Sequence, residues 1–156
     1  MHKAGPSHLH SHVGYWLRCL SNLVSSTFAD RLAKRDISVA QWVVLRTLYE
    51  KRNVTLNEAA AEVGVDKSSL SRMVERLVQR GLLVRGEGSD RRSVGLALTP
   101  AAVKLVPQLS ALADKNDEEF FTGLSARERE EFLATIKRLL SANGWDLAKR
   151  GLDQMK

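Results

Sequence analysis

The sequence predicts a mainly α-helical protein with one small β-hairpin, and three observations lead to this fold class. Apolar residues recur at three- and four-residue steps over long stretches, and four helix starts carry capping signatures. The pattern changes to short alternating runs only between Leu82 and Thr99. The 156 residues, 44% apolar and 27% charged, suit one packed domain and exclude a chain that stays disordered.

The composition also bears on the compartment. The longest stretch without a charged residue runs from Ala4 to Leu17, which is shorter than the ~18 to 20 residues of a membrane span. Residues 1–12 lack the apolar segment of a secretory signal, and the single cysteine, Cys19, has no partner for an internal disulfide. We therefore expect a cytoplasmic protein that does not enter the membrane.

The helices are justified in order by periodicity and caps. Apolar residues on one face predict a long amphipathic helix from Leu9 to Leu32. Ser38 with Gln41, Thr55 with Glu58 and Ser125 with Glu128 form capping boxes, and Thr99 precedes a proline suited to a first helical position. The predicted helices that follow these caps run from Ser38 to about Lys51, from Thr55, from Pro100 to about Phe121, and from Ala126 to about Ala142.

The segment from Leu56 to Leu77 predicts two helices joined by a tight turn. Gly64 permits a left-handed turn, and Asp66 caps the second helix, which Gly81 terminates. The second helix carries an apolar face, made of Leu70, Met73, Val74, Leu77 and Val78. Its other face is polar and includes Lys67, Ser68, Ser69, Ser71, Arg72, Glu75, Arg76 and Gln79. This is the pattern of a helix-turn-helix.

A β-hairpin with a basic tip follows directly. Leu82 to Arg85 and Val94 to Leu98 predict its strands, and residues 86–93 between them are rich in turn residues and charge. Residues 1–65 carry 8 basic and 5 acidic side chains, residues 66–92 carry 7 and 4, and residues 93–156 carry 9 and 9. The net charge of +6 thus arises before residue 93 and favours an anionic partner, such as nucleic acid or a membrane surface, unless it is scatter in a small sample.

The polar helix face fits a reader of the DNA major groove. Small hydroxyls allow close approach, an arginine pairs with guanine, and flanking cations meet phosphates. The expected contacts are Lys67, Ser68, Ser69, Ser71, Arg72 and Arg76. The alternative is an ordinary helical hairpin with a solvated face, and the basic loop placed after the helix favours DNA over that alternative.

From about Gly14 to Ala142 the sequence resembles the MarR family of winged helix-turn-helix regulators. The resemblance is carried by residues 66–77, by Arg80-Gly-Leu-Leu83, and by Asp90-Arg-Arg92, which five intervening residues separate from Leu98-Thr99. It implies a homodimer whose N- and C-terminal helices interlock, a palindromic operator, and the helix with Ser68 and Arg72 in the major groove. It also implies a wing, here Arg85, Ser89, Asp90, Arg91 and Arg92, with Arg92 entering the minor groove and Asp90 orienting the wing.

The resemblance gives a domain division and a function. Residues 1–36 form an N-terminal arm and dimerisation helix, residues 37–99 the DNA-binding lobe, and residues 100–156 the C-terminal dimerisation helices of one intertwined domain. The helix after Pro100, ~30 Å long, would protrude with an uncovered apolar face that a partner chain or the helix from Leu9 to Leu32 covers. The expected function is sequence-specific repression relieved by a small effector.

In the resembled family, effectors, often aromatic acids, bind between the first helices and the lobe. The expected lining is Tyr15, Trp16, Arg18, Trp42 and Arg46, which supply aromatic walls and a cation. The alternative is that these residues belong to the core and the dimer seam.

The sequence patterns that would indicate a metal site, a redox-active cysteine or an enzyme are weaker. His8, His10 and His12 have no carboxylate or cysteine nearby, so no metal and no cofactor is expected. Cys19 is expected to be buried, and a redox-responsive regulator is the alternative. No phosphate-binding loop or nucleophile motif points to an enzyme, and nonspecific nucleic-acid binding is the remaining alternative.

Overall fold

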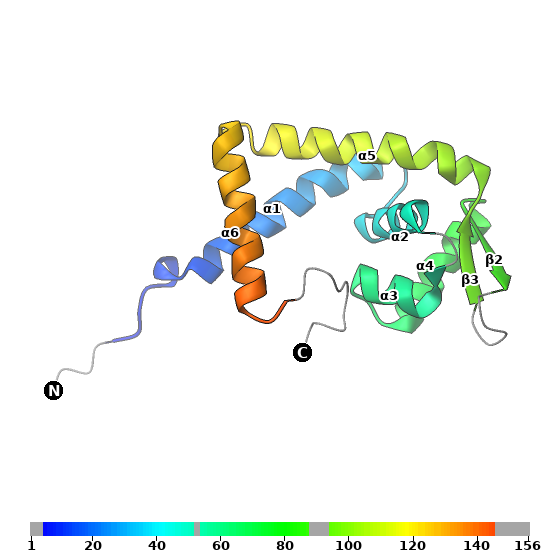
Figure 1. Cartoon of the computed structure of the whole chain (residues 1–156), viewed down its shortest axis with the longest axis horizontal. Helices are drawn as coiled ribbons and strands as arrows, with labels where there is room; N and C mark the ends of the chain where they lie inside the picture. Colours follow the sequence, from blue (N-terminus) through cyan, green and yellow to red (C-terminus); the bar gives the residue numbers. More distant parts are fainter. Residues whose placement is uncertain (1–4, 52–53, 88–93, 146–156) are drawn as a thin grey trace.

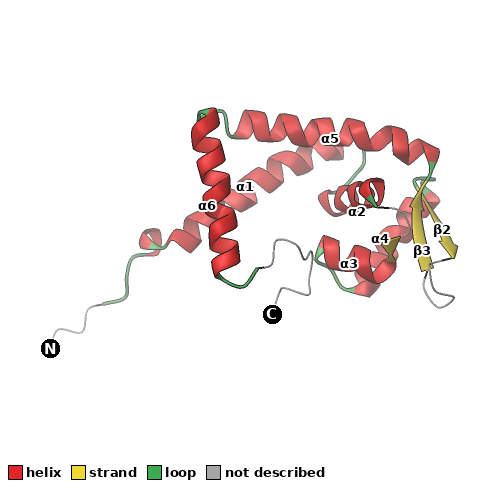
Figure 2. Cartoon of the chain, viewed as in Figure 1, coloured by secondary structure: helices red, strands yellow, loops and turns green. Residues whose placement is uncertain are grey.

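The computed structural model describes residues 5–51, 54–87 and 94–145, and these form a helical protein with a small antiparallel sheet (Figures 1 and 2). The elements in order are a 3₁₀ turn η1 (Leu9–Ser11), α1 (Val13–Ala33), α2 (Val39–Glu50), β1 (Val54–Thr55), α3 (Leu56–Val63), α4 (Lys67–Gln79), β2 (Leu83–Glu87), β3 (Val94–Leu98), α5 (Pro100–Phe120) and α6 (Ala126–Ala142). The fold class predicted from the sequence is confirmed.

The capping signatures begin helices where the sequence predicts them. All three capping boxes are formed, and the Thr99 side chain accepts a hydrogen bond from the Ala102 N–H ahead of α5. The first helix begins later than predicted, at Val13 rather than Leu9. His12 is extended there, and the preceding 3₁₀ turn is held by a 2.9 Å hydrogen bond from Trp16 Nε1 to the His10 carbonyl.

The sheet has the order β1-β3-β2, so β3 is its central strand. The predicted hairpin pairs Leu83 with Leu98 and Glu87 with Val94. The two-residue strand β1 was not predicted from the sequence, and it pairs Val54 with Leu96. It fastens the start of the helix-turn-helix to the wing.

One core joins the lobe to the long helices. The lobe contributes fully buried leucines and valines from α2 and α4, among them Leu45, Leu70 and Leu77. The same cluster continues into α1 through Leu32 and into α5 through Val106. The lobe is therefore anchored on helices that extend beyond it (Figure 1).

Helices α1 and α5 pack together within the chain. The buried Asn116 of α5 donates to the Val24 carbonyl at 3.4 Å and accepts from Arg31 Nε at 3.2 Å. Arg31 also forms an ion pair with Glu119, and its hydrogen bond lowers the pKa of that carboxyl. Of the two alternatives for the apolar face of α5, a partner chain or the first helix, the structure shows the second, because α1, together with α2, covers that face.

The uncovered apolar surface lies instead on α6 and on the N-terminal half of α1. No residue of α6 is buried, and in Figure 1 this helix stands apart from the lobe. The exposed large apolar residues of these two regions are Leu9, Val13, Trp16, Leu17, Leu23, Leu133, Leu139 and Leu140. None of the helices within the described ranges combines the length and the hydropathy needed to cross a membrane.

Candidate nucleic-acid interface

The turn between α3 and α4 has the predicted chemistry. Gly64 adopts φ 77°, a left-handed conformation that a Cβ disfavours, and its N–H donates to the Ala60 carbonyl at 3.0 Å. Ala59 and Ala60 are buried at the contact with α4, where small side chains allow the two helices to approach closely. This turn sets the start of α4.

Asp66 caps α4 and fixes one of its serines. The Asp66 carboxylate accepts from the Ser69 hydroxyl at 2.6 Å and from the Ser69 N–H at 2.9 Å. These two bonds favour the charged carboxylate and lower the pKa of Asp66. The Ser69 hydroxyl is therefore engaged by the cap, whereas Ser68 beside it is exposed.

The outer face of α4 presents cations and hydroxyls to solvent. Lys67, Arg72 and Arg76 are exposed, and Ser71 is half-buried. The inner face is fixed to the lobe, since Leu70, Val74 and Leu77 have no exposed surface. A rigid helix with one polar, cationic face is the geometry that a major groove accepts.

The root of the wing is tied to this helix. Arg85 on β2 forms an ion pair with Glu75 on α4, with a nitrogen-to-oxygen distance of 3.2 Å. Of the predicted wing contacts, Arg85 lies within the structure, whereas Ser89, Asp90, Arg91 and Arg92 lie outside the described residues. Helix α4 and the hairpin occupy the same end of the molecule (Figure 1).

The predicted effector residues fall into separate groups. Tyr15 and Trp16 cluster with His10, with ring centroids 5.2 to 5.6 Å apart, and Arg18 is exposed near them on α1. Trp42 instead packs edge-to-face on Phe28. Phe28 lies twelve residues, or about 18 Å, beyond Trp16 along α1. A single chain does not bring the five residues together.

Arg46 also lies apart from the other predicted effector residues. It pairs with Glu50 at 3.0 Å and lies 5.9 Å from the centre of the Tyr49 ring. Arg46 is therefore engaged on the surface of α2.

Trp42 lines a cavity of about 240 Å³ between α1, α2 and α5, together with Val24, Ser25, Phe28, Val39, Ala113, Asn116 and Asp117. The Trp42 Nε1 atom is buried and has no hydrogen-bond partner among the described residues. Sequence reasoning placed Trp42 in the effector site and counted Phe28 among the aromatic residues near the N-terminus without assigning it to the site, but it missed Asn116. Asn116 interrupts the apolar face of α5, and that was the available signal.

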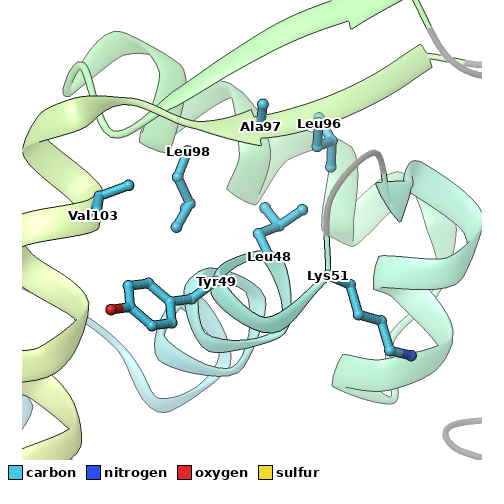
Figure 3. Close-up of a pocket in the computed structure, with 7 residues that line it drawn as sticks. All are labelled: Leu48, Tyr49, Lys51, Leu96, Ala97, Leu98 and Val103. Carbon is cyan, nitrogen blue, oxygen red and sulfur yellow. The ribbon is translucent and has the colours of Figure 1, made fainter.

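A second cavity, of about 510 Å³, separates the end of α2 from β3 and the start of α5 (Figure 3). Leu48, Leu98 and Val103 line it, and Tyr49 and Lys51 stand at its rim. Its lining is distributed over three elements, so no local sequence pattern indicates this cavity. Unlike the Trp42 cavity, it has no buried unpartnered side-chain donor among the described residues.

The expectation that Cys19 is buried is wrong for the single chain, because the residue is exposed. A hydrogen bond with this thiol raises the pKa of Tyr15. Among the described residues no group of three or more histidine, cysteine and carboxylate side chains is placed to hold a metal ion.

A helix-turn-helix with a cationic outer face, followed directly by a β-hairpin, defines a winged helix-turn-helix DNA-binding protein. The MarR family model matches residues 35–93, which cover the lobe. The chain is also similar to Bordetella bronchiseptica BpsR, with 27% identity and a TM-score of 0.76 over 87% of this chain and 99% of that one. That structure concerns the regulation of DNA binding by 6-hydroxynicotinic acid.

Two further structures extend the similarity. Apo MarR from E.coli is 25% identical with a TM-score of 0.73 and covers 83% of this chain and 97% of its own. The DNA complex of S. aureus MepR shares the fold, with 24% identity, a TM-score of 0.74, and coverage of 84% and 98%. The lobe matches the MarR family over residues 35–93, and the chain is a DNA-binding transcription regulator with the fold of that family's solved members.

Proposed function

We propose that the protein is a repressor that binds a palindromic operator as a homodimer through α4 and the wing. The observation that carries the proposal is the outer face of α4, where Lys67, Ser68, Arg72 and Arg76 are exposed, whereas Leu70, Val74 and Leu77 on the opposite face are fully buried. Ser71 borders this face, and the Ser69 hydroxyl is available only if its bond to Asp66 breaks. Arg72 is the base-reading residue, and Lys67 and Arg76 meet phosphates. Arg85, Ser89, Asp90, Arg91 and Arg92 extend the contact through the wing.

Exposed apolar surface supports the homodimer. Leu17 on α1 is 45% exposed, and Leu133 and Leu139 on α6 are 50% and 51% exposed. Apolar residues gathered on two terminal helices, of which one buries nothing in its own chain, are typical of a surface that an identical chain covers. Two copies related by a two-fold axis present two α4 helices to one face of a duplex.

The test is selection of bound sequences from a random duplex library, followed by footprinting. We expect a palindrome whose half-sites lie one helical turn, ~34 Å, apart. Placed over a promoter in a reporter strain, this site should lower expression when the protein is present. Uniform coating of DNA without a selected sequence would support the nonspecific alternative.

The Trp42 cavity favours an effector function in addition. A buried indole N–H without a partner carries a desolvation cost that a ligand acceptor would remove. Phe28 and Val24 supply apolar walls that suit an aromatic ring. We propose a small aromatic acid as the ligand, and the regulation of BpsR by 6-hydroxynicotinic acid gives a first compound to test.

The effector proposal is tested by thermal melting with 6-hydroxynicotinate and salicylate. A ligand of the native state raises the Tm with concentration. Trp42→Phe keeps an aromatic side chain but removes the donor together with part of the bicyclic indole, and it should lose most of the shift. Arg46→Ala is the second variant, and its retention of a full shift would exclude Arg46 from the ligand site. Tyr15, Trp16 and Arg18 enter this site only if a partner chain brings them there.

A further inference from the structure

Helix α1 ends in a turn that contains an unusual residue. The Ile37 N–H donates to the Leu32 carbonyl at 3.2 Å and the Asp36 N–H to the Ala33 carbonyl at 2.9 Å, which is the Schellman pattern. Asp36 occupies the left-handed position of this turn, with φ 54°, and is the one non-glycine residue with positive φ in the described part of the chain. A side chain with a Cβ is disfavoured there, so neighbouring contacts must hold the turn.

Helix α4 ends in the same pattern. Leu82 N–H donates to the Leu77 carbonyl and Gly81 N–H to the Val78 carbonyl, both at 2.9 Å, and Gly81 takes the left-handed position with φ 68°. Arg80 is the residue immediately before this glycine. The C-cap residue of α4 thus lies at a sharply turned helix end.

Arg80 joins the two helix ends. Its guanidinium donates to the Asp36 carbonyl through Nη1 and to the Arg35 carbonyl through Nη2, the latter at 3.4 Å. Arg80 Nη2 also lies 3.6 Å from a carboxylate oxygen of Asp36, but that side chain is 93% exposed and adds little. The positive charge sits at the C-terminal end of α1, where the helix dipole favours a cation.

Helix α5 is attached at the same place. The Thr99 hydroxyl donates to the Gly81 carbonyl at 2.7 Å, and Arg35 Nη1 donates to Gln108 of α5 at 2.9 Å. The end of α4 is therefore hydrogen-bonded to the N-cap of α5, and the end of α1 is hydrogen-bonded to Gln108 further along that helix. Together with the bonds of Arg80, these contacts connect α4 to both long helices.

We propose that Arg80 is a positioning residue for DNA recognition, which holds α4 at its working angle to α1 by bridging the carbonyls of Arg35 and Asp36, and which does not itself contact phosphate. The inference rests on the proposed role of α4 as the reading helix. It assigns different roles to two exposed arginines one helical turn apart, since the Arg80 guanidinium is hydrogen-bonded to the end of α1, whereas Arg76 is proposed to meet phosphate.

The charge-conserving substitution separates the two roles. A lysine at position 80 keeps the positive charge but lacks the planar fork that spans two carbonyls. We expect Arg80→Lys and Arg80→Ala each to weaken binding to the selected palindrome about tenfold. The slope of log Kd against log salt should stay at the wild-type value in both, because no phosphate contact is lost.

Arg76 provides the matched control. Arg76→Lys should bind nearly as wild type, and Arg76→Ala should reduce the salt slope by about one phosphate equivalent. Asp36→Asn keeps the turn carbonyl and tolerates the left-handed conformation, so it should bind as wild type. Amide hydrogen exchange at Ile37 should be faster in Arg80→Lys than in Asp36→Asn, because the bridge to the turn is lost only in the former.

Three results would overturn the inference. Wild-type affinity in Arg80→Lys would show that charge alone suffices, and a reduced salt slope in Arg80→Ala would make Arg80 a phosphate contact. Loss of cooperative melting in both Arg80 variants would make it a folding residue. Failure of the wild-type protein to select any sequence would instead refute the proposed function, which keeps the two failures distinct.

Discussion

The helices of the lobe and the terminal helix α6 differ in whether their own chain buries their apolar side chains. The short helices of the lobe bury residues completely, as α4 does with Leu70, Val74 and Leu77. Helix α6 is longer than α4, at 17 residues against 13, yet buries none. Length and capping therefore form both helices, but only the lobe helices obtain tertiary packing from their own chain. Five predictions test this difference, beginning with the largest expected effect.

Truncation of a side chain in the lobe core should lower the free energy of unfolding the most. Leu70→Ala removes a fully buried side chain of α4 from the core, and we expect the free energy of unfolding to fall by about 2 to 5 kcal/mol. Urea denaturation measures this value. Val84→Ala, at a 48% exposed position of the same lobe, is the control and should change it by no more than ~0.5 kcal/mol.

Truncation on α6 should act through association. Leu139→Ala removes apolar surface that we propose a partner chain covers, so dimerisation should weaken by about 1.5 to 3 kcal/mol. Sedimentation equilibrium reports the dissociation constant, and the Val84→Ala variant should associate as wild type. If Leu139→Ala leaves the dissociation constant unchanged, α6 is not part of the dimer surface.

Truncation on the outer face of α4 should leave folding intact and change recognition. Arg72→Ala should weaken binding to the selected site by roughly 1 to 3 kcal/mol and relax one base preference. Lys67→Ala should weaken binding to all sequences alike. Equal losses on selected and random duplexes for both variants would contradict the assignment of Arg72 as the base-reading residue.

Separating the wing from α4 should have a smaller effect. Glu75→Gln removes the ion pair with Arg85, which is solvent-exposed, so stability should change by at most about 0.5 kcal/mol. Binding to random DNA should strengthen slightly, because a negative charge beside the phosphates is lost. Fluorescence anisotropy on a random duplex measures this change, and weaker binding would mean that Glu75 positions Arg85 for DNA.

The smallest effect concerns the α4 cap. The pKa of Asp66 is lowered in the folded protein, so this carboxylate stabilises the fold above the ordinary aspartate pKa, and its contribution is lost as the pH falls through the lowered value. Asp66→Asn keeps a good cap without a titrating group. The stability difference between wild type and Asp66→Asn, measured by urea denaturation, should move in favour of the variant between pH 6 and pH 3. A constant difference would contradict the role of the charged cap.

Local chemistry made most of the fold predictable. Caps at Ser38, Thr55, Thr99 and Ser125 each depend on residues three positions apart, so the sequence displays them directly. Strand β1 has no such signature, because two residues show no alternation and its pairing depends on β3, forty residues away. Its existence follows from tertiary packing rather than from propensity.

The nucleic-acid interface and the effector site also differ in how far the sequence predicts them. The outer face of α4 follows from helical periodicity, so the residues placed on it share one helix. The effector residues were grouped by residue type within the first fifty positions, and type does not tell which turn of α1 meets the lobe. The structure places Phe28 against Trp42, whereas Trp16 lies three turns away.

The capped junction at Thr99 has a consequence for protein engineering. Strand β3 ends at Leu98 and α5 begins at Pro100, with Thr99 as their only connection. Thr99 hydrogen bonds to Gly81 and Leu82 also bind this junction to the end of α4. A chimaera that transplants the lobe from a relative should therefore carry along its α5 and also the end of its α1, which bonds to Arg80. Recombination at residues 99 and 100 would break the junction between β3 and α5, which orients the lobe.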